Sequence, residues 1–361
     1  MCADAEISSS CVADERVVED ELDCGSNVLA AGQQHRWRLL DDSLWTLRQH
    51  SEKADPALAV LRTLFDQPRW VDPSYLYDDR GSDLFEEISQ LPEYYLTRLE
   101  DGILEREAAN IVATAPVECL VELGAGFSKK TRHLLREQVK QRGRGIFAPV
   151  DVSPLALKGS RDPQQEAFPE IRFEGLVARY EDAIASIDVE LPTLFVFLGS
   201  TVGNFTRVQF GHFFHQLSSN MGPNDFLLLG VDEVKEAAIV ERAYNDSRGL
   251  TADFVLNAFD HINRLTGSNF DRAKMEYSPF YNSQKRQMEM YALPTSSQEI
   301  RFPDVQASFR WEEAEPILVE ISRKFVLSSL LSQLQFFGLE LVQRHNDRQQ
   351  WFSVLLFRRS P

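Results

Sequence analysis

Several common site signatures are missing from this 361-residue chain. It has no Gly-Lys-Ser or Gly-Lys-Thr triplet, so a P-loop for nucleoside triphosphates is excluded. No run approaches the roughly 20 apolar residues that a membrane-spanning helix needs. Basic residues are also scarce, with 38 Lys and Arg against 55 Asp and Glu and a net charge of −17. This balance argues against nucleic-acid partners and anionic membrane surfaces, because both are bound through Lys and Arg.

Cysteine is equally sparse. The chain has four cysteines and no Cys-x-x-Cys spacing, and three of them lie within the first 30 residues. A disulfide framework is therefore not expected, and a reducing cytoplasm is the predicted location. Residues 1–30 are acidic and lack both a basic n-region and an apolar segment, so they are interpreted as a disordered tail and not as a signal peptide.

The middle of the chain alternates between strand and helix patterns. Strands are predicted at 118–123, 145–151, 171–177, 193–198 and 225–231, and helices at 129–141, 154–160, 180–187 and 206–219. This spacing indicates a parallel sheet covered by helices. After a helix at 325–336, two strands at 339–345 and 350–358 are predicted to close the sheet as a hairpin. The fold class is therefore α/β, with a Rossmann-like sheet of the S-adenosylmethionine (SAM)-dependent methyltransferase kind.

The flanking segments break this alternation and predict a second, substrate-binding α+β domain. Helices are expected at 35–49, 55–65 and 83–91, a mostly helical stretch at 235–266, and a strand within 277–293. The predicted division is a tail at 1–30, a substrate-binding or lid domain at 31–100 plus 235–324, and a SAM-binding domain at 101–234 plus 325–361.

The segment 117–130 reads as a buried strand, a glycine turn and a helix start capped by Ser128. Gly124 and Gly126 allow a sharp turn and a close approach to a ligand. The dinucleotide fingerprint requires a third glycine where this chain has Lys129. Two glycines followed by Asp151 at the end of the second strand favour a nucleoside without pyrophosphate, for which SAM is the leading candidate. An NAD-type cofactor and a plain strand–turn–helix are the alternatives.

A second glycine-rich turn, Gly199 to Phe205, follows the fourth strand. Asn204 is either a substrate contact or a helix N-cap. Tyr77, Tyr94 and Tyr95 flank turns and form either a pocket wall or part of the core.

Two other patterns carry no predicted chemistry. His212 and His215 have helical spacing but no further metal ligands nearby, so no metal is expected and a helix face is favoured. The segment 199–203 has its serine one place too early for a hydrolase nucleophile elbow.

Taken together, the motifs resemble the histidine Nα-methyltransferase family of ergothioneine biosynthesis, in its bacterial stand-alone form. The matching segments are YDDRGSDLFEEISQLPEYYLTRLE at 77–100, VELGAGFSKKTRHLL at 121–135, PVDVSPLAL at 149–157, FLGSTVGNF at 197–205, GVDEVK at 230–235, AYNDSRGLT at 243–251 and EISRKF at 320–325. They lie in order across residues 75–330, and the acidic tail is outside the resemblance.

The resemblance implies a reaction and two sets of contacts. The expected reaction is SAM-dependent Nα-trimethylation of L-histidine to hercynine, with SAM as the cofactor. Independently of the resemblance, a cytoplasmic monomer is expected, because the predicted lid domain already covers the ends of the strands. The implied SAM contacts are Tyr94, Gly124, Gly126, Lys130 and Asp151. The implied substrate contacts are Tyr77, Gly199, Asn204, Tyr244, Met290, Glu320 and Ser322, with Tyr77 in the catalytic position near the α-amine. Asn204 and Tyr244 are expected to hold the carboxylate, and Glu320 and Ser322 the imidazole, with Met290 beside the ring.

One position departs from the family pattern. The family has an aspartate near the adenine where this chain has Arg179, with Asp182 close by. Two alternative functions stay open, and the departure at Arg179 supports only the second of them. The first is N-methylation of another amino acid, such as a tryptophan derivative, or of an imidazole nitrogen. The second is a SAM- or amino-acid-binding protein without catalysis.

Overall fold

The structure is a computed structural model that describes residues 36–41, 44–48, 55–186 and 191–360. The segment for which a disordered tail is predicted, residues 1–30, lies outside these ranges.

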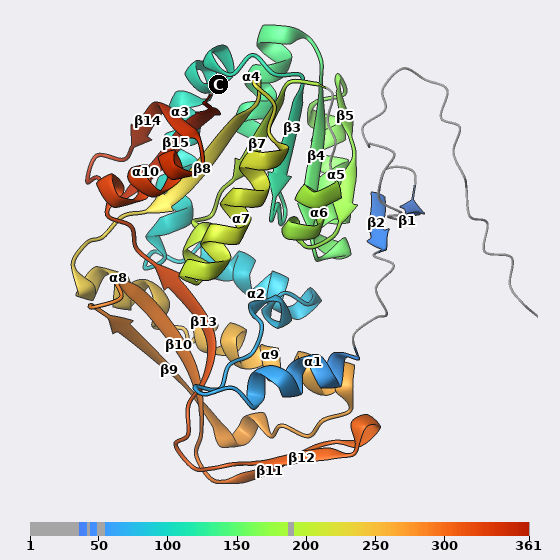
Figure 1. Ribbon diagram of the computed structural model, residues 1–361, viewed down its shortest axis with the longest axis vertical. Coiled ribbons are helices and arrows are strands. Elements are labelled where there is room, and N and C mark those ends of the chain that lie inside the picture. Colours follow the sequence, from blue (N-terminus) through green and yellow to red (C-terminus); the bar gives the residue numbers. More distant parts are fainter. Residues whose placement is uncertain (1–35, 42–43, 49–54, 187–190, 361) are drawn as a thin grey trace, which may run out of the picture.

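A mainly parallel sheet forms the centre of the molecule (Figure 1). Its main path runs β6-β4-β3-β7-β8-β15-β14, with β5 paired to β4. The bounds are β3 (Cys119–Leu123), β4 (Gly145–Asp151), β5 (Ile171–Phe173), β6 (Gly175–Val177), β7 (Thr193–Phe197), β8 (Phe226–Asp232), β14 (Leu339–Asn346) and β15 (Phe352–Arg359). Strands β3 to β8 pair in parallel, whereas β15 pairs antiparallel with both β8 and β14. The predicted parallel sheet closed by a C-terminal hairpin is therefore confirmed.

The N-terminal edge differs from the prediction of a helix at 35–49. The described residues there form β1 (Arg36–Asp41) and β2 (Leu44–Arg48), an antiparallel pair whose second strand runs parallel to β6. The helix prediction was wrong because the strand state depends on pairing with the sheet edge at residues 175–177, which local sequence does not reveal.

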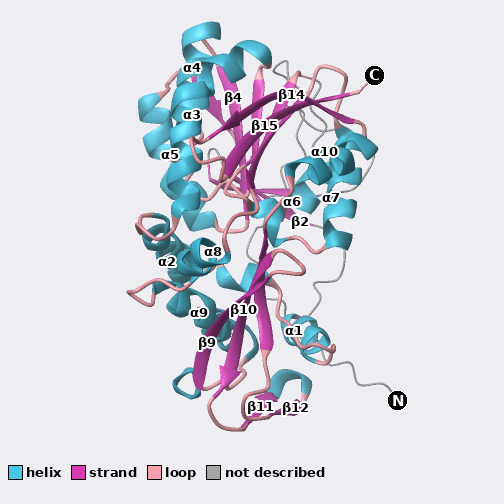
Figure 2. Ribbon diagram, turned by 90° about the vertical axis from the view of Figure 1, so that its left-hand side faces the viewer, coloured by secondary structure: helices cyan, strands magenta, loops and turns pink. Residues whose placement is uncertain are grey.

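Helices cover both faces of the central sheet (Figure 2). One face carries α3 (Tyr95–Thr114), α4 (Arg132–Arg142) and α5 (Pro154–Ala167), and the other carries α6 (Tyr180–Ser186), α7 (Arg207–Asn220) and α10 (Leu327–Phe336). Successive strand residues alternate between the two buried clusters, so Leu194 and Val196 pack on one side and Phe195 and Phe197 on the other. Because both faces are buried, the strands read as continuous apolar runs.

A smaller sheet, in the order β13-β10-β9, lies at the far end of the molecule (Figure 1). Its strands are β9 (Met275–Asn282), β10 (Gln287–Pro294) and β13 (Ile317–Arg323), and a hairpin of β11 (Gln298–Phe302) and β12 (Ala307–Trp311) follows β10 in the chain. The predicted single strand at 277–293 is thus a β9–β10 hairpin. Around this sheet are α1 (Pro56–Leu64), η1 (Pro73–Leu76), α2 (Asp79–Ser89), α8 (Ala237–Tyr244) and α9 (Leu250–Thr266). Short turns η3 (Arg272–Lys274) and η4 (Pro303–Val305) complete this region.

Helix α2 begins four residues before the predicted start at Asp83. Asp78 caps it by accepting a hydrogen bond from the Gly81 amide at 2.7 Å. Gly81 is needed for close packing, because a Cβ there would lie 1.7 Å from the Leu76 carbonyl oxygen. Gly81 therefore lies inside α2, although the helix was predicted to start after it.

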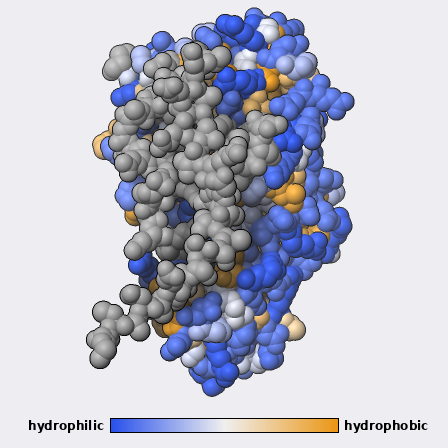
Figure 3. Space-filling view, turned by 90° about the vertical axis from the view of Figure 1, so that its right-hand side faces the viewer, coloured by the Kyte–Doolittle hydropathy of each residue, from blue (hydrophilic) through white to orange (hydrophobic). Residues whose placement is uncertain are grey.

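The described surface in Figure 3 is mainly hydrophilic, in keeping with the acidic composition. None of the described helices is long and apolar enough to cross a membrane. The division into a SAM-binding and a substrate-binding domain remains a prediction.

Candidate active site

The turn after β3 has the geometry that its two glycines predict. Gly124 and Gly126 have φ values of 68° and 51°, in the left-handed region. The amides of Gly124 and Ala125 donate to the Val150 carbonyl at 2.9 and 3.0 Å, which ties the turn to the end of β4. A Cβ at either glycine would meet nothing within 4 Å, so the backbone conformation and not crowding calls for glycine. The turn therefore faces open space at the carboxyl edge of the sheet.

The helix after this turn starts later than predicted. Thr131 stands at the N-cap of α4 and makes no side-chain capping bond. The predicted cap, Ser128, is buried, and its hydroxyl has no hydrogen-bond partner among the described residues.

Asp151, at the end of β4, is bonded to the same turn. Its Oδ2 accepts from the Gly126 amide at 2.8 Å, and its Oδ1 accepts from the Ser153 amide at 2.9 Å. Burial raises the pKa of Asp151, and these two hydrogen bonds act in the opposite direction. A carboxylate fixed in this way has lone pairs left for ribose hydroxyls, the contact predicted for it.

Lys130 reaches from the turn to a buried carboxylate. Its Nζ forms an ion pair with Glu100 of α3, a fully buried residue that also accepts the Gly199 amide at 2.9 Å. Gly230 makes room for this carboxylate, since a Cβ there would lie 1.9 Å from Glu100 Oε1. Glu100 thereby joins the two glycine-rich turns. Sequence reasoning gave it no role.

Two of the three tyrosines near residues 77–95 line the same cavity, and the third does not. The Tyr77 ring packs edge-on against Phe85 and Phe254, with ring centroids 6.0 and 5.4 Å away. Tyr94 lies at the N-terminus of α3 and also lines the cavity. Tyr95 instead donates to Asp232 Oδ2 at 2.8 Å. The pocket-wall interpretation thus fits Tyr77 and Tyr94, whereas Tyr95 belongs to the interior.

The second glycine-rich turn brings Asn204 to the smaller sheet. Asn204 ends η2 (Thr201–Asn204), and its Nδ2 donates to Glu320 Oε1 at 2.8 Å. The N-cap of α7 is Thr206, which forms a capping box with Gln209. The N-cap alternative for Asn204 was therefore wrong, and its amide faces a carboxylate.

Glu320 and Ser322 lie two residues apart on β13, so their side chains point to the same face of the strand. Both are buried and both line the cavity. Burial raises the pKa of Glu320 to about 8, and the nearby Lys324 charge lowers it. The Ser322 hydroxyl is 2.8 Å from the Tyr244 hydroxyl, a contact that joins β13 to α8.

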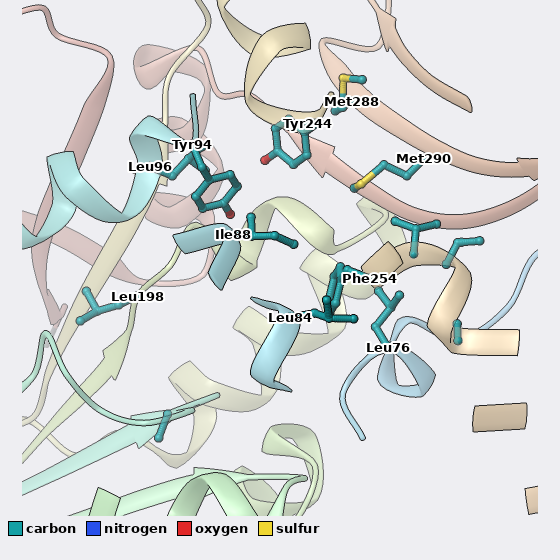
Figure 4. Packing of buried hydrophobic residues seen from close by; sticks show 14 of the residues in the cluster. Leu76, Leu84, Ile88, Tyr94, Leu96, Leu198, Tyr244, Phe254, Met288 and Met290 are labelled. Atoms are coloured by element: carbon teal, nitrogen blue, oxygen red, sulfur yellow. The ribbon is translucent and has the colours of Figure 1, made fainter. Parts of the chain in front are cut away.

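Met290 is the one predicted contact that does not line the cavity. It lies on β10 directly opposite Glu320 in the strand register and is buried. Figure 4 shows it in the apolar cluster that also holds Tyr94 and Tyr244. Its contact with a substrate ring stays a prediction.

All the other predicted contacts line one cavity of about 300 Å³. On the cofactor side they are Tyr94, Gly124, Gly126, Lys130 and Asp151, and on the substrate side Tyr77, Gly199, Asn204, Tyr244, Glu320 and Ser322. Tyr77 follows η1 and Tyr94 precedes α3, and the others come from the central sheet, its carboxyl-edge turns, α8 and the smaller sheet. The cavity therefore lies between the two sheets.

Comparison with known proteins identifies the family of the chain. Residues 55–359 match the family described as histidine-specific, SAM-dependent methyltransferases. The chain belongs to this family. The histidine N-alpha-methyltransferases of Mycolicibacterium smegmatis and Mycobacterium tuberculosis are 35% and 34% identical to it over 84% and 80% of this chain, and over 96% and 90% of their own lengths. The ergothioneine biosynthesis protein 1 of Neurospora crassa is 34% identical over 56% of this chain and 24% of its own length.

Glu122 is a cavity residue that sequence reasoning missed in this methyltransferase. It is buried on β3, where its Oε1 accepts from the Thr131 hydroxyl and its Oε2 has no partner among the described residues. Burial raises the pKa of Glu122 to about 7. This buried carboxyl beside the open glycine turn fits a ligand that brings hydrogen-bond donors and positive charge. The ammonium and sulfonium of SAM have that chemistry.

Arg179, at the position where the resemblance implies an aspartate, also lines the cavity. Its Nη1 and Nη2 lie 3.4 Å from Asp72 Oδ2, and its Nε lies 3.7 Å from Glu181 Oε2. The guanidinium is therefore balanced by two carboxylates, Asp72 and Glu181, and both belong to the cavity wall. Two acidic groups stand close to the position where the resemblance implies one.

Proposed function

We propose that this methyltransferase transfers three methyl groups from SAM to the α-amine of L-histidine and so forms hercynine, the first step of ergothioneine biosynthesis. The observation that carries the proposal is a buried carboxylate, Glu320, on the wall of a cavity that also contains the SAM-type glycine turn. A carboxyl oxygen of Glu320 that accepts a hydrogen bond from an imidazole N–H favours histidine and disfavours an apolar ring.

The amino-acid end of the substrate has matching groups. Asn204 and Tyr244 supply an amide and a hydroxyl on the same wall as Glu320. These groups suit the substrate carboxylate, while the Gly199 carbonyl and the Tyr77 hydroxyl suit the α-amine. The two ends of L-histidine would then fix the position of the amine between them.

Methyl transfer from SAM to an amine creates no new charge, so it has little need of a general acid or an oxyanion hole. Bound SAM would supply an electrophilic methyl group on a sulfonium. The positive charge then moves to nitrogen, so the residues need to align the amine and keep it neutral. An α-amine titrates near roughly 8, so losing its proton is a modest step near neutral pH. Burial raises the pKa of Tyr77 well above its usual value, so its neutral hydroxyl accepts a hydrogen bond from the amine and does not act as a phenolate base.

Three successive transfers to one nitrogen require space and no competing cation. The cavity volume is about 300 Å³. Lys130 is paired with Glu100, and Arg179 with Asp72 and Glu181. Aromatic rings at Tyr77 and Phe205 line the cavity, and ring faces favour a growing quaternary ammonium.

The test is mass spectrometry of the purified protein incubated with SAM and a mixture of histidine, tryptophan and other amino acids. Addition of three methyl groups to histidine alone is the expected result. Methylation of another amino acid would retain the fold and cofactor but overturn the role of Glu320. Bound SAM without methylation of any amino acid would support a binding protein without catalysis.

We also expect the enzyme to work as a cytoplasmic monomer on a small molecule, without nucleic acid or membrane partners. The acidic net charge of −17 supports the absence of nucleic-acid binding. Size-exclusion chromatography with light scattering tests the monomer.

A further inference from the structure

A buried ammonium lies directly behind the substrate side of the cavity. Lys324 follows β13, and its side chain is fully buried. Its Nζ lies 2.9 Å from the Tyr244 hydroxyl, 2.9 Å from the Ser322 hydroxyl and 2.8 Å from Asp232 Oδ2. Tyr244 and Ser322 line the cavity, whereas Lys324 and Asp232 do not.

The contacts of Lys324 fix which atoms of the Tyr244–Ser322 pair donate and which accept. An ammonium has three hydrogens and accepts none. Its three neighbours here are all acceptors, so each hydrogen of Lys324 has one partner, and both hydroxyls must accept from it. Tyr244 and Ser322 also share the 2.8 Å hydrogen bond between them, which uses one of their two hydroxyl hydrogens. One hydroxyl hydrogen is left over.

That remaining hydrogen has a restricted direction. It cannot point toward Lys324, which offers only donors, and the direction between the two hydroxyls is already taken. The open side of the pair is the cavity. We propose that Lys324 is a positioning residue that turns the one free hydroxyl hydrogen of the Tyr244–Ser322 pair toward the substrate. This inference rests on the proposed function, because it concerns how L-histidine is held.

The arrangement suits a substrate that offers an acceptor opposite this pair. A neutral imidazole has one N–H and one nitrogen lone pair. Glu320 is an acceptor for the N–H, and a fixed hydroxyl donor complements the lone pair or the carboxylate. An indole ring has an N–H but no such lone pair, so the fixed donor would face it without a partner. A free hydrogen on Ser322 that faces the ring therefore adds to discrimination against an indole, whereas a free hydrogen on Tyr244 serves the carboxylate.

The chain contains a matched control for this role. The side chain of Lys235 is also buried, and it forms an ion pair with the other oxygen of the same carboxylate, Asp232 Oδ1. It contacts the Tyr95 hydroxyl and the Glu233 carbonyl, but not Tyr244 or Ser322. Removing either lysine leaves Asp232 with one ammonium fewer, so both changes have a similar structural cost. Only Lys324 is bonded to the hydroxyls of the cavity.

The experiment compares Lys324→Met with Lys235→Met in the full chain. Histidine KM, kcat and the SAM dissociation constant are measured, with thermal unfolding as a check on folding. Lys324→Met is expected to raise the histidine KM by about tenfold or more, as for loss of an oriented hydrogen bond, with the SAM dissociation constant unchanged within about twofold. Lys235→Met is expected to leave the histidine KM within about twofold. Equal effects of the two changes on the histidine KM would overturn the proposal.

A second comparison distinguishes the loss of hydroxyl orientation from a general loss of structure around Lys324. In a Tyr244→Phe/Ser322→Ala background there is no hydroxyl hydrogen to direct, so Lys324→Met is expected to cause no further loss of histidine affinity. If the full loss persists there, Lys324 acts through structure alone and the proposal fails.

If Lys324→Met does not fold, the Tyr244→Phe and Ser322→Ala variants supply the test. Each single variant keeps one hydroxyl hydrogen, so the double variant should lose more affinity than the product of the two single losses. A double loss equal to or below that product would contradict a shared hydrogen. Histidine methylation by the wild-type enzyme is measured before any variant is made. Its absence would overturn the proposed function and not the role of Lys324.

Discussion

Asn204 Nδ2 donates a hydrogen bond of 2.8 Å to Glu320 Oε1, across 116 positions of sequence. Asn204 lies at the carboxyl edge of the central sheet, and Glu320 lies on β13 of the smaller sheet. The bond therefore joins the two sheets at the cavity wall. It fixes one oxygen of Glu320, while Oε2 makes no hydrogen bond with the described residues and is left for a ligand.

Replacing Glu320 with Ala should selectively weaken histidine binding. The variant loses the acceptor for the imidazole N–H and leaves the Asn204 amide without its partner. We expect the histidine KM to rise at least thirtyfold, or about 2 kcal/mol, as for a charged hydrogen bond. The SAM dissociation constant should change by less than about threefold. Steady-state kinetics and calorimetry measure the two quantities.

Glu289→Ala is the matched control for that change. Glu289 is also a buried glutamate in the smaller sheet, but it is bonded to Tyr291, Gln287 and Lys285 and does not line the cavity. Its removal should lower stability without changing the ratio of histidine to SAM affinity. An unchanged histidine KM in Glu320→Ala would remove the basis for substrate specificity proposed here.

Glu320 should also make the ligand-free protein less stable at alkaline pH. Burial raises the pKa of Glu320 to about 8, from a usual value of 4.5. Between these values the folded state binds more protons than the unfolded state, so this group's contribution to the free energy of unfolding falls as the pH rises. Glu320→Gln cannot ionise and should remove that loss.

We therefore expect Glu320→Gln to raise Tm relative to the wild type at pH 8.5 and to change it little at pH 4.5. The stabilisation at the higher pH should be at least ~1 kcal/mol, the order of the cost of a poorly solvated polar group. Thermal unfolding at both pH values without histidine is the measurement. A Tm difference that does not depend on pH would show that Glu320 ionises normally in the folded protein.

The central sheet could be predicted because each of its strands is marked by a local pattern of apolar residues. Residues 194–198 form a continuous apolar run, as expected of a strand buried on both faces, and Gly199 follows it directly. The two turns could also be placed, since both follow strand ends at the same edge of a parallel sheet.

Other features depend on contacts between distant segments, and these were missed. Glu100 reads as one more charge on a helix, yet it is fully buried against Lys130 and Gly199. Strand β13 carries Glu320 and Ser322, and it was recognised as part of the site only through the family resemblance. The pattern of burial along β13 depends on pairing with β10, which no local periodicity specifies.

Gly126→Ala should weaken SAM binding through the backbone. Gly126 has φ 51°, a region that costs about 1 kcal/mol or more for a residue with a Cβ, although there is space for the atom itself. The change also shifts the amide that donates to Asp151. We expect the SAM dissociation constant to rise by about tenfold, measured by calorimetry.

Gly143→Ala provides the comparison. Gly143 has φ 73°, a Cβ there meets nothing within 4 Å, and it ends α4 away from the cavity. Both substitutions should therefore cost a similar amount of stability, and only Gly126→Ala should change SAM affinity. If the two variants bind SAM with equal affinity, the turn at Gly126 does not take part in SAM binding.

Tyr77→Phe distinguishes a positioning hydroxyl from a base. The Tyr77 hydroxyl makes no hydrogen bond with the described residues, and its ring is held by Phe85 and Phe254, so phenylalanine should preserve the packing. We expect kcat to fall by about tenfold, while histidine and SAM affinities stay within about threefold, because the lost contact aligns the reacting amine. Tyr75→Phe, whose ring packs against His261 outside the cavity wall, should leave kcat unchanged.

The pH profile of the same variant decides how the amine loses its proton. Burial raises the pKa of Tyr77 well above 10, so its phenolate is scarce near neutral pH. The rising limb of kcat/KM should therefore follow the substrate amine, near roughly pH 8 to 9, and should keep the same midpoint in Tyr77→Phe. If the limb disappears or moves in the variant, Tyr77 itself accepts the proton. In that case its raised pKa in the ligand-free protein must fall when SAM brings its positive charge into the cavity.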